Sequence, residues 1–437
     1  MNSGYARCAV VQSLHLSLPQ KLAIDGDWLM MRSGRAHWGV MMRRYGMGWL
    51  LGLCLIGAAA VTWYCWPQPV VERPLVIWSG RNIPELNALG REFTARTGRA
   101  VRVETPGNFV EKFEILAQQG QGPDIIIWAH DRFAAWAQAG LLESIPTSAL
   151  PQGHCLPEAA APLREADRLL GYPLQLESLV LFWNRALMSS APRDDGEFAH
   201  LASTLPKGVD LLGWDLSSSY HSWPFVSAGV TRGLWVDEQQ RLRLHADQPR
   251  VVANMQRLAD WIRYGWMPHG LSYELALDRF SQGKLAMMVG GPWDAHRLDQ
   301  SGVDYGVAGL PALAGRAVHP FYGVMAAGIS SHSSEKLLAR EFIEQSLLTA
   351  KGMALYQADV ETGLVACYGQ PQALNARRQA ILQSVRQGVA MPSHPAMPLF
   401  WNSSTAALNN YFTGRQSAQE AWQEAELRVN QPPQKGS

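Results

Sequence analysis

The chain has 437 residues, of which 47% are hydrophobic and 17% are charged, and its formal net charge is +1. A chain of this length usually divides into two or three domains, and this composition is typical of folded proteins with large cores rather than of disordered chains. A net charge so near zero gives no electrostatic reason to expect nucleic acid as a partner.

An uncharged stretch, GWLLGLCLIGAAAVTWYCW, follows Arg43 and Arg44 near the amino terminus. It is long enough to cross a bilayer as a helix, and its basic flank would stay in the cytoplasm. A cleaved secretory signal is the second interpretation. The apolar character that continues through Val61, Trp63, Tyr64 and Trp66 favours an uncleaved anchor. Either interpretation exports the rest of the chain. The residues before this stretch form an extension that a translation start at Met41 or Met42 would largely omit.

The five cysteines show neither C-x-x-C spacing nor a neighbouring histidine pair, so we expect no metal site. Cys155 and Cys367 could form a disulfide after export. Two cysteines this far apart in sequence are more often buried and free, and we favour that interpretation.

Strand and helix patterns alternate in the first part that follows this stretch. The expected elements, in chain order, are a strand at Leu75–Trp78, a helix from Pro84 to Gly98, a strand at Ala100–Val103, a helix at Phe109–Gln119, a strand at Asp124–Trp128 and a helix over about 131–139. This βαβαβα order implies a parallel sheet with helices on both faces. Ligands of such sheets bind beyond the carboxyl ends of the strands, where Ser79-Gly80 and Trp128–Arg132 fall.

Later segments predict a second lobe. Strands are expected at 171–173, 179–183, 285–289 and 305–310, and helices at 250–265, 273–283, 335–348, 400–412 and 418–429. The first two of these strands could carry the chain between the lobes. The polar tail at 431–437 is expected to be disordered.

Several segments resemble the maltose/maltodextrin-binding proteins of bacterial ABC importers, which belong to the extracellular solute-binding protein superfamily. The segments are LVIW at 75–78, GPDIIIWAHDRF at 122–133, Tyr172-Pro173 with Glu177, Ser222-Trp223-Pro224, GGPW at 290–293, and Met391-Pro392 followed by Phe400-Trp401. Their order and spacing match from about residue 74 to 430, which is more specific than any single motif.

The resemblance implies an α/β, two-lobed periplasmic-binding-protein fold with a ligand cleft between the lobes, preceded by an N-terminal hydrophobic helix. The expected divisions are an extension at 1–46, a signal or anchor helix at 47–66, a linker at 67–73, a first lobe at 74–175 plus 327–370, a second lobe at 180–321 plus 377–430, and the tail at 431–437.

Aromatic rings stack on the C–H face of a sugar, while carboxylates and guanidinium groups bind its hydroxyls. Through the resemblance, Trp128, Tyr220, Trp293 and Trp401 match aromatics that stack on or cover glucose rings, and Tyr273 matches a further contact. The resemblance also matches Asp131, Arg132 and Glu177 to residues that bind hydroxyls, and Met391 to an apolar wall of the cleft.

The residues by themselves leave other interpretations open. A tryptophan usually fills a core, and Met391 is equally suited to one. Asp131 could cap a helix, or form a solvated surface pair with Arg132.

The chain also departs from the family pattern. The loop after Trp78 is two residues shorter, so Arg81 or Asn82 must replace the family's Asp-Lys pair. Two ligand-binding glutamates of the family fall at Val110 and Ser218. A neighbouring aromatic becomes His221. Each lost carboxylate could remove about 1.5–3 kcal/mol of hydrogen bonding, which puts affinity for unmodified maltose in doubt.

The function implied by the resemblance is the extracytoplasmic component of a carbohydrate importer, binding an oligosaccharide with closure of the lobes and without a cofactor. Its partners would be the permease subunits of the inner membrane, and it would be a periplasmic monomer, either secreted or tethered through residues 47–66. A sugar sensor that presents to a chemoreceptor or signalling partner is the first alternative. A glycoside hydrolase using Asp131 and Glu177 is the second, but the chain lacks catalytic motifs and has lost carboxylates.

Overall fold

The computed structural model describes residues 73–231, 233–245, 248–357, 364–369 and 374–431. The predicted extension at 1–46, the hydrophobic segment at 47–66, nearly all of the linker and most of the tail lie outside these residues. Within the described part of the chain, no helix is both long and apolar enough to cross a membrane.

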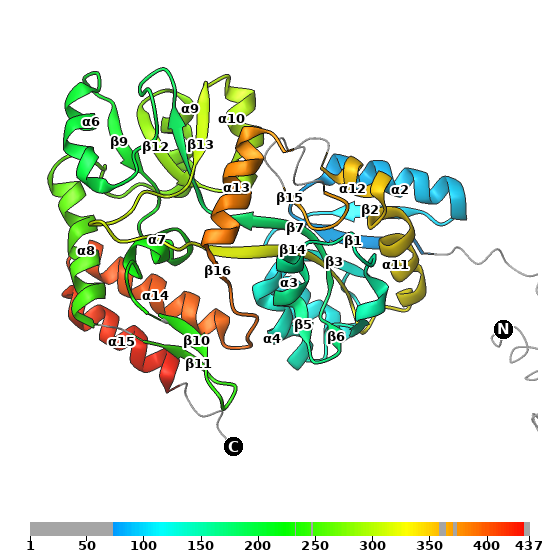
Figure 1. Ribbon diagram of the computed structural model, residues 1–437. Coiled ribbons are helices and arrows are strands. Elements are labelled where there is room, and N and C mark those ends of the chain that lie inside the picture. The colour runs from blue at the N-terminus through cyan, green and yellow to red at the C-terminus, as the bar shows by residue number, and fades with distance from the viewer. Residues whose placement is uncertain (1–72, 232, 246–247, 358–363, 370–373, 432–437) are drawn as a thin grey trace, which may run out of the picture. The chain divides into compact units, whose positions relative to one another are not determined.

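The first lobe is built on a mixed sheet with the strand order β15-β7-β14-β3-β1-β2, and β16 pairs with β14 (Figure 1). Its strands are β1 (Leu75–Ser79), β2 (Val101–Glu104), β3 (Ile125–Ala129), β7 (Tyr172–Ser178), β14 (Phe321–Ile329), β15 (Leu364–Val365) and β16 (Val389–Ala390). Its helices are α2 (Ile83–Thr97), α3 (Phe109–Leu116), α4 (Phe133–Gln138), α5 (Pro157–Ala160), α11 (Lys336–Phe342) and α12 (Ala350–Tyr356). The short strands β4 (Ile145–Pro146), β5 (Arg164–Glu165) and β6 (Arg168–Leu169) form a separate small sheet.

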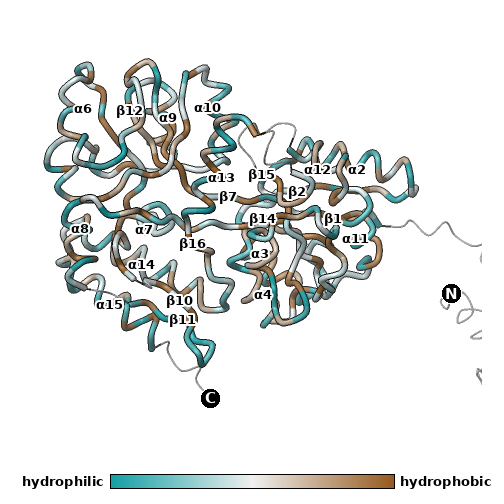
Figure 2. The backbone as a smooth tube through the Cα atoms, viewed as in Figure 1, coloured by the Kyte–Doolittle hydropathy of each residue, from teal (hydrophilic) through white to brown (hydrophobic). Residues whose placement is uncertain are grey.

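The amino-terminal βαβαβα pattern is confirmed. In α2, Pro84 lies in the first turn, the buried side chains include Leu86, Leu89 and Phe93, and Gly98 ends the helix with φ 74°. A left-handed residue at this position is favourable only for glycine, and this accounts for the helix boundary. Figure 2 shows hydrophobic and hydrophilic residues alternating along α2, as expected for a helix with one buried face.

The parallel arrangement predicted from the βαβαβα order is confirmed for its three strands, but the complete sheet is mixed. Strand β1 runs parallel to β2 and β3, but β14 is antiparallel to both β3 and β7. Strand β14 was not predicted, although it lies in the middle of the sheet. Its segment, FYGVMAAGI, is apolar nearly throughout and contains two glycines, so it lacks the alternation that marks a half-buried strand.

The second lobe contains a four-stranded sheet with the order β13-β8-β12-β9. Its strands are β8 (Val180–Asn184), β9 (Asp210–Gly213), β12 (Leu285–Gly290) and β13 (Tyr305–Ala308), with a hairpin of β10 (Leu234–Val236) and β11 (Leu242–Leu244). Helices α6 (Phe198–Thr204), α7 (Ser219–Val226), α8 (Gln248–Arg263), α9 (Tyr273–Ser281), α10 (Ala295–Ser301), α14 (Met397–Phe412) and α15 (Ala418–Asn430) belong to this lobe, and α13 (Ala376–Gln387) contacts strands of both sheets.

The chain passes directly from one sheet to the other. Only Leu179 separates β7 of the first sheet from β8 of the second, and α13 lies beside this crossing (Figure 1). The structure is therefore an α/β fold with two lobes, as predicted.

The preference for free cysteines was wrong, because Cys155 and Cys367 form a disulfide. The segments around them pair as antiparallel backbone: Leu156 N donates to Ala366 O at 2.8 Å, and Tyr368 N donates to His154 O at 2.7 Å. The two cysteines are 212 residues apart in sequence, so no local pattern predicted this disulfide. They meet because β15 joins the edge of the sheet.

Candidate ligand-binding site

The loop after β1 places Arg81 at the centre of the predicted site. Its guanidinium forms an ion pair with Glu177, which lies near the carboxyl end of β7 and is only 5% exposed. The same guanidinium lies 5.4 Å from the centre of the Trp293 ring, in the second lobe. Arg81 therefore connects the two lobes.

Asn82, the other candidate in this loop, has a different role. Its backbone is left-handed, with φ 54°, and it immediately precedes α2. Its side-chain Nδ2 donates to the backbone oxygen of Tyr356 at 2.8 Å, which ties the start of α2 to α12. Of the two candidates, only Arg81 directs its side chain toward other predicted site residues. The amide of Asn82 is used within the first lobe.

Asp131 follows β3 in a short 3₁₀ turn, His130–Arg132, and is 8% exposed. Its Oδ2 accepts a 3.0 Å hydrogen bond from the indole Nε1 of Trp401, in α14. Burial raises the pKa of Asp131 above its usual value, and the positive charge of the adjacent, partly buried Arg132 opposes that effect. Asp131 caps no helix and is not a solvated surface group, so both alternative interpretations were wrong.

Aromatic rings from several elements of the second lobe gather opposite these charges. The centre of the Tyr220 ring lies 6.0 Å from that of Trp293 and 6.0 Å from that of Trp401. His221, next to Tyr220 in α7, lies 6.0 Å from the ring centre of Tyr273. Burial raises the pKa of Tyr220, so its hydroxyl stays protonated and can donate a hydrogen bond.

The hydroxyl of Tyr273 donates to Asp294, which follows Trp293 in the turn after β12. Asp294 also accepts a 2.9 Å hydrogen bond from the backbone N–H of Gly291. These contacts hold the turn that presents Trp293. Burial raises the pKa of Asp294 to about 6, because the ionised carboxylate is removed from water.

His221 and Ser218 occupy the positions where the sequence departs from the family pattern. Their side chains are joined by a 2.8 Å hydrogen bond between Ser218 Oγ and His221 Nδ1. Burial lowers the pKa of His221 to about 4, so the ring is neutral at pH 7. Its Nε2 is buried and has no hydrogen-bond partner among the described residues. A neutral imidazole therefore lies among the aromatic rings.

A second buried histidine supports the turn that carries Asp131. The backbone N–H of Val324 donates to His130 Nδ1 at 3.1 Å, so Nε2 must carry the proton and donate to the backbone oxygen of Met391 at 2.9 Å. Burial lowers the pKa of His130, in keeping with this neutral form. The Met391 side chain is 4% exposed and belongs to the second-lobe core, which fits the alternative role considered for it.

Six of the predicted residues form a continuous chain of side-chain contacts. Its order is Glu177, Arg81, Trp293, Tyr220, Trp401 and Asp131. Trp128, by contrast, lies in β3, partly buried against the first-lobe core.

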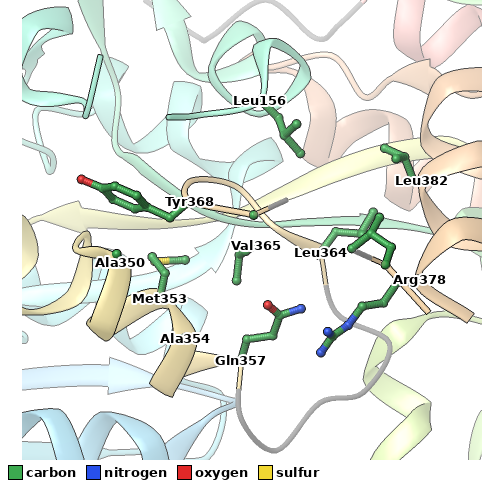
Figure 3. Close-up of a pocket in the computed structure, with 12 residues that line it drawn as sticks. Leu156, Ala350, Met353, Ala354, Gln357, Leu364, Val365, Tyr368, Arg378 and Leu382 are labelled. Atoms are coloured by element: carbon green, nitrogen blue, oxygen red, sulfur yellow. The ribbon is translucent and has the colours of Figure 1, made fainter. Parts of the chain in front are cut away.

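A pocket of about 300 Å³ adjoins this chain of contacts between the lobes. Its walls come from the loop after β1, the start of α2, β7, and the turn after β12, and they include Arg81, Asn82 and Trp293. Another pocket, of about 340 Å³, lies between α12, β15 and α13, where Figure 3 shows Met353, Val365 and Leu382 among its walls. That pocket contains none of the predicted site residues. Among the described residues, no group of three or more His, Cys, Asp or Glu side chains is placed to hold a metal ion.

Comparisons with known proteins place the chain in a family. A family described as "Bacterial extracellular solute-binding protein" matches residues 88–366, more than half of the chain. The maltodextrin-binding protein MdxE of Bacillus subtilis (strain 168) is 24% identical over 341 residues, covering 72% of this chain and 79% of that protein. The maltotriose-binding protein of Pyrococcus abyssi is 24% identical over 360 residues, covering 77% and 76%.

The galactooligosaccharide-binding protein of Bacillus subtilis (strain 168) is 21% identical over 329 residues, covering 72% of this chain and 78% of that protein. These relatives are distant. The family match nevertheless extends over more than half of the chain, and this chain belongs to the bacterial extracellular solute-binding proteins, a family of binding proteins rather than enzymes.

Proposed function

We propose that the chain is the extracytoplasmic component of a carbohydrate ABC importer and that it binds an oligosaccharide similar to maltose or maltodextrin. Two of the relatives bear the names of maltodextrin- and maltotriose-binding proteins, and a third is named for galactooligosaccharides. All three names describe sugar oligomers, which supports an oligosaccharide as the ligand. The periplasm, a monomeric state and the permease subunits as partners are part of the same proposal.

The proposal depends above all on the continuous contacts from Glu177 to Asp131. They combine aromatic rings with charged groups, and a pyranose needs both kinds of partner, because its ring faces are apolar and its rim carries hydroxyls. The pairing of Arg81 with Glu177 and of Trp401 with Asp131 also orients these groups before a ligand arrives. Preorganised groups lose less entropy on binding, which favours affinity.

The side chains in these contacts come from both lobes, so a sugar that touches both lobes would favour a closed arrangement of the protein. Closure would follow from differential binding: the closed form makes contacts from two sides and the open form from one. We propose that the aromatic residues of the second lobe and the charged residues of the first lobe act together in this way. The permease would then distinguish the closed form from the open one.

A titration tests the proposal directly. The purified chain is titrated with maltose, maltotriose, trehalose and sucrose while tryptophan fluorescence and the heat of binding are recorded. At least one sugar should shift the emission, and Trp293→Ala should abolish the response by removing a stacking surface. Trp235→Ala, in the β10–β11 hairpin, is the matched control and should respond like the unsubstituted chain. If none of the four sugars produces heat or an emission change, the proposal is wrong.

A further inference from the structure

The pocket between the lobes contains a buried carboxylate that no predicted contact uses. Glu85 lies in the first turn of α2, lines this pocket and is only 6% exposed. Its Oε2 is buried and has no hydrogen-bond partner among the described residues. Burying a carboxylate oxygen without a hydrogen-bond donor costs free energy, and a ligand hydroxyl that reached it would remove that cost.

Glu85 lies at the amino-terminal end of α2. The helix has fifteen residues, and its first-turn N–H groups carry partial positive charge toward Glu85. Arg81, the one arginine among the pocket walls, is paired with Glu177. Arg81 therefore does not serve as an ion-pair partner of Glu85.

The other pocket walls are suited to a sugar unit. Trp293 supplies an aromatic surface from the second lobe, and Gln175, itself 6% exposed, supplies an amide from β7. A volume of about 300 Å³ is large enough for one hexose ring. The pocket therefore combines an aromatic surface, an amide and an unpaired carboxylate next to the contacts already described.

We propose that Glu85 is a ligand-binding residue that accepts a hydrogen bond from a hydroxyl of a neutral hexose unit in this pocket. The inference deepens the proposed function and depends on it. The chain lacks carboxylates at Val110 and Ser218, and Glu85 supplies one at a different place. This change in position would favour sugars that place a hydroxyl next to Glu85 over sugars whose hydroxyls need a carboxylate at positions 110 and 218.

The test compares three variants of the full chain by calorimetric titration with maltose, maltotriose, trehalose and sucrose. Glu85→Leu should lower the affinity for the best-bound sugar by about tenfold or more, because a hydrogen bond to a carboxylate is lost. Glu85→Gln keeps an acceptor oxygen without the charge and should show a smaller loss. Glu92→Gln, two turns further along α2 at an exposed ion pair with Lys351, is the matched control and should bind like the unsubstituted chain.

A thermal melt without sugar separates a binding role from a structural one. If Glu85 serves the ligand, replacing an unpaired buried carboxylate with leucine should leave the midpoint unchanged or raise it while affinity falls. A Glu85→Leu affinity within about twofold of the unsubstituted chain, or a fall in affinity matched by a fall in melting temperature, overturns this inference alone. If the unsubstituted chain binds none of the four sugars, the proposed function and this inference both fall.

Discussion

The indole Nε1 of Trp401 donates a 3.0 Å hydrogen bond to Oδ2 of Asp131, although 270 residues separate them in the chain. The bond joins α14 of the second lobe to the turn after β3 of the first. It also gives the buried Asp131 a hydrogen-bond donor from the opposite lobe. The pair therefore orients one predicted stacking residue and one predicted hydroxyl-binding residue at the same time.

Trp401→Phe should destabilise the protein by about 1–3 kcal/mol at pH 7, because Asp131 stays buried and loses a donor while the ring area is largely kept. Burial already raises the pKa of Asp131, and losing the indole N–H raises it further. The decrease in unfolding free energy caused by Trp401→Phe should therefore become smaller as the pH falls and Asp131 becomes protonated in the folded state. Urea denaturation of both proteins at several pH values measures this decrease.

Trp422→Phe provides the control for this prediction. The Trp422 Nε1 is buried without a hydrogen-bond partner among the residues described, so Trp422→Phe should change the unfolding free energy by an amount that does not vary with pH. If the effect of Trp401→Phe is also independent of pH, the bond to Asp131 does not affect stability.

Asp294 should make the protein less stable as the pH rises. Burial raises its pKa from 3.8 to about 6, so the folded state binds more protons than the unfolded state between these values. Stability therefore falls across this range, and the penalty is complete above pH 6. Relative to Asp294→Asn, the unsubstituted protein should lose about 2.4 kcal/mol of unfolding free energy between pH 4 and pH 7.

The same denaturation series on Asp304→Asn serves as the reference, because it removes an exposed carboxyl that is paired with Arg185. If the difference between Asp294→Asn and the unsubstituted protein does not change between pH 4 and pH 7, the raised pKa of Asp294 is contradicted.

Arg81→Met should destabilise the protein by about 2–3 kcal/mol, because it leaves the buried carboxylate of Glu177 without its partner. Glu177→Gln should cost less, since the Arg81 side chain is one-third exposed and can be hydrated. The double variant should be more stable than Arg81→Met alone. Guanidinium denaturation of all four proteins completes the cycle, and strictly additive losses would mean that the two side chains do not interact.

Cys155→Ala should lower the unfolding free energy by about 2–5 kcal/mol, because the disulfide to Cys367 closes a long loop in the unfolded chain. The unsubstituted protein treated with a reductant should lose a similar amount. Alkylation followed by mass spectrometry should label neither cysteine before reduction. Labelling of both in the native protein would show that the bond is absent.

The sequence predicted what neighbouring residues determine. The order of elements from Leu75 to Gln138 followed from local periodicity, from Pro84 at a helix start and from Gly98 at its end, which are features that act within a turn or two of the chain. The motif WAHDR, together with the other segments that resemble the family, likewise indicated the family and the types of residue expected in the cleft. The lobe boundaries and the ligand contacts of these residues remain predictions.

The tertiary structure decided which distant groups meet. It placed β14 between β3 and β7, paired Cys155 with Cys367, and directed Arg81 rather than Asn82 toward the other site residues. It also buried Asp131 against Trp401, where the sequence allowed a helix cap or a solvated pair. These outcomes depend on packing between segments hundreds of residues apart, and the energy of such contacts is set by burial and geometry that no local pattern of residues encodes.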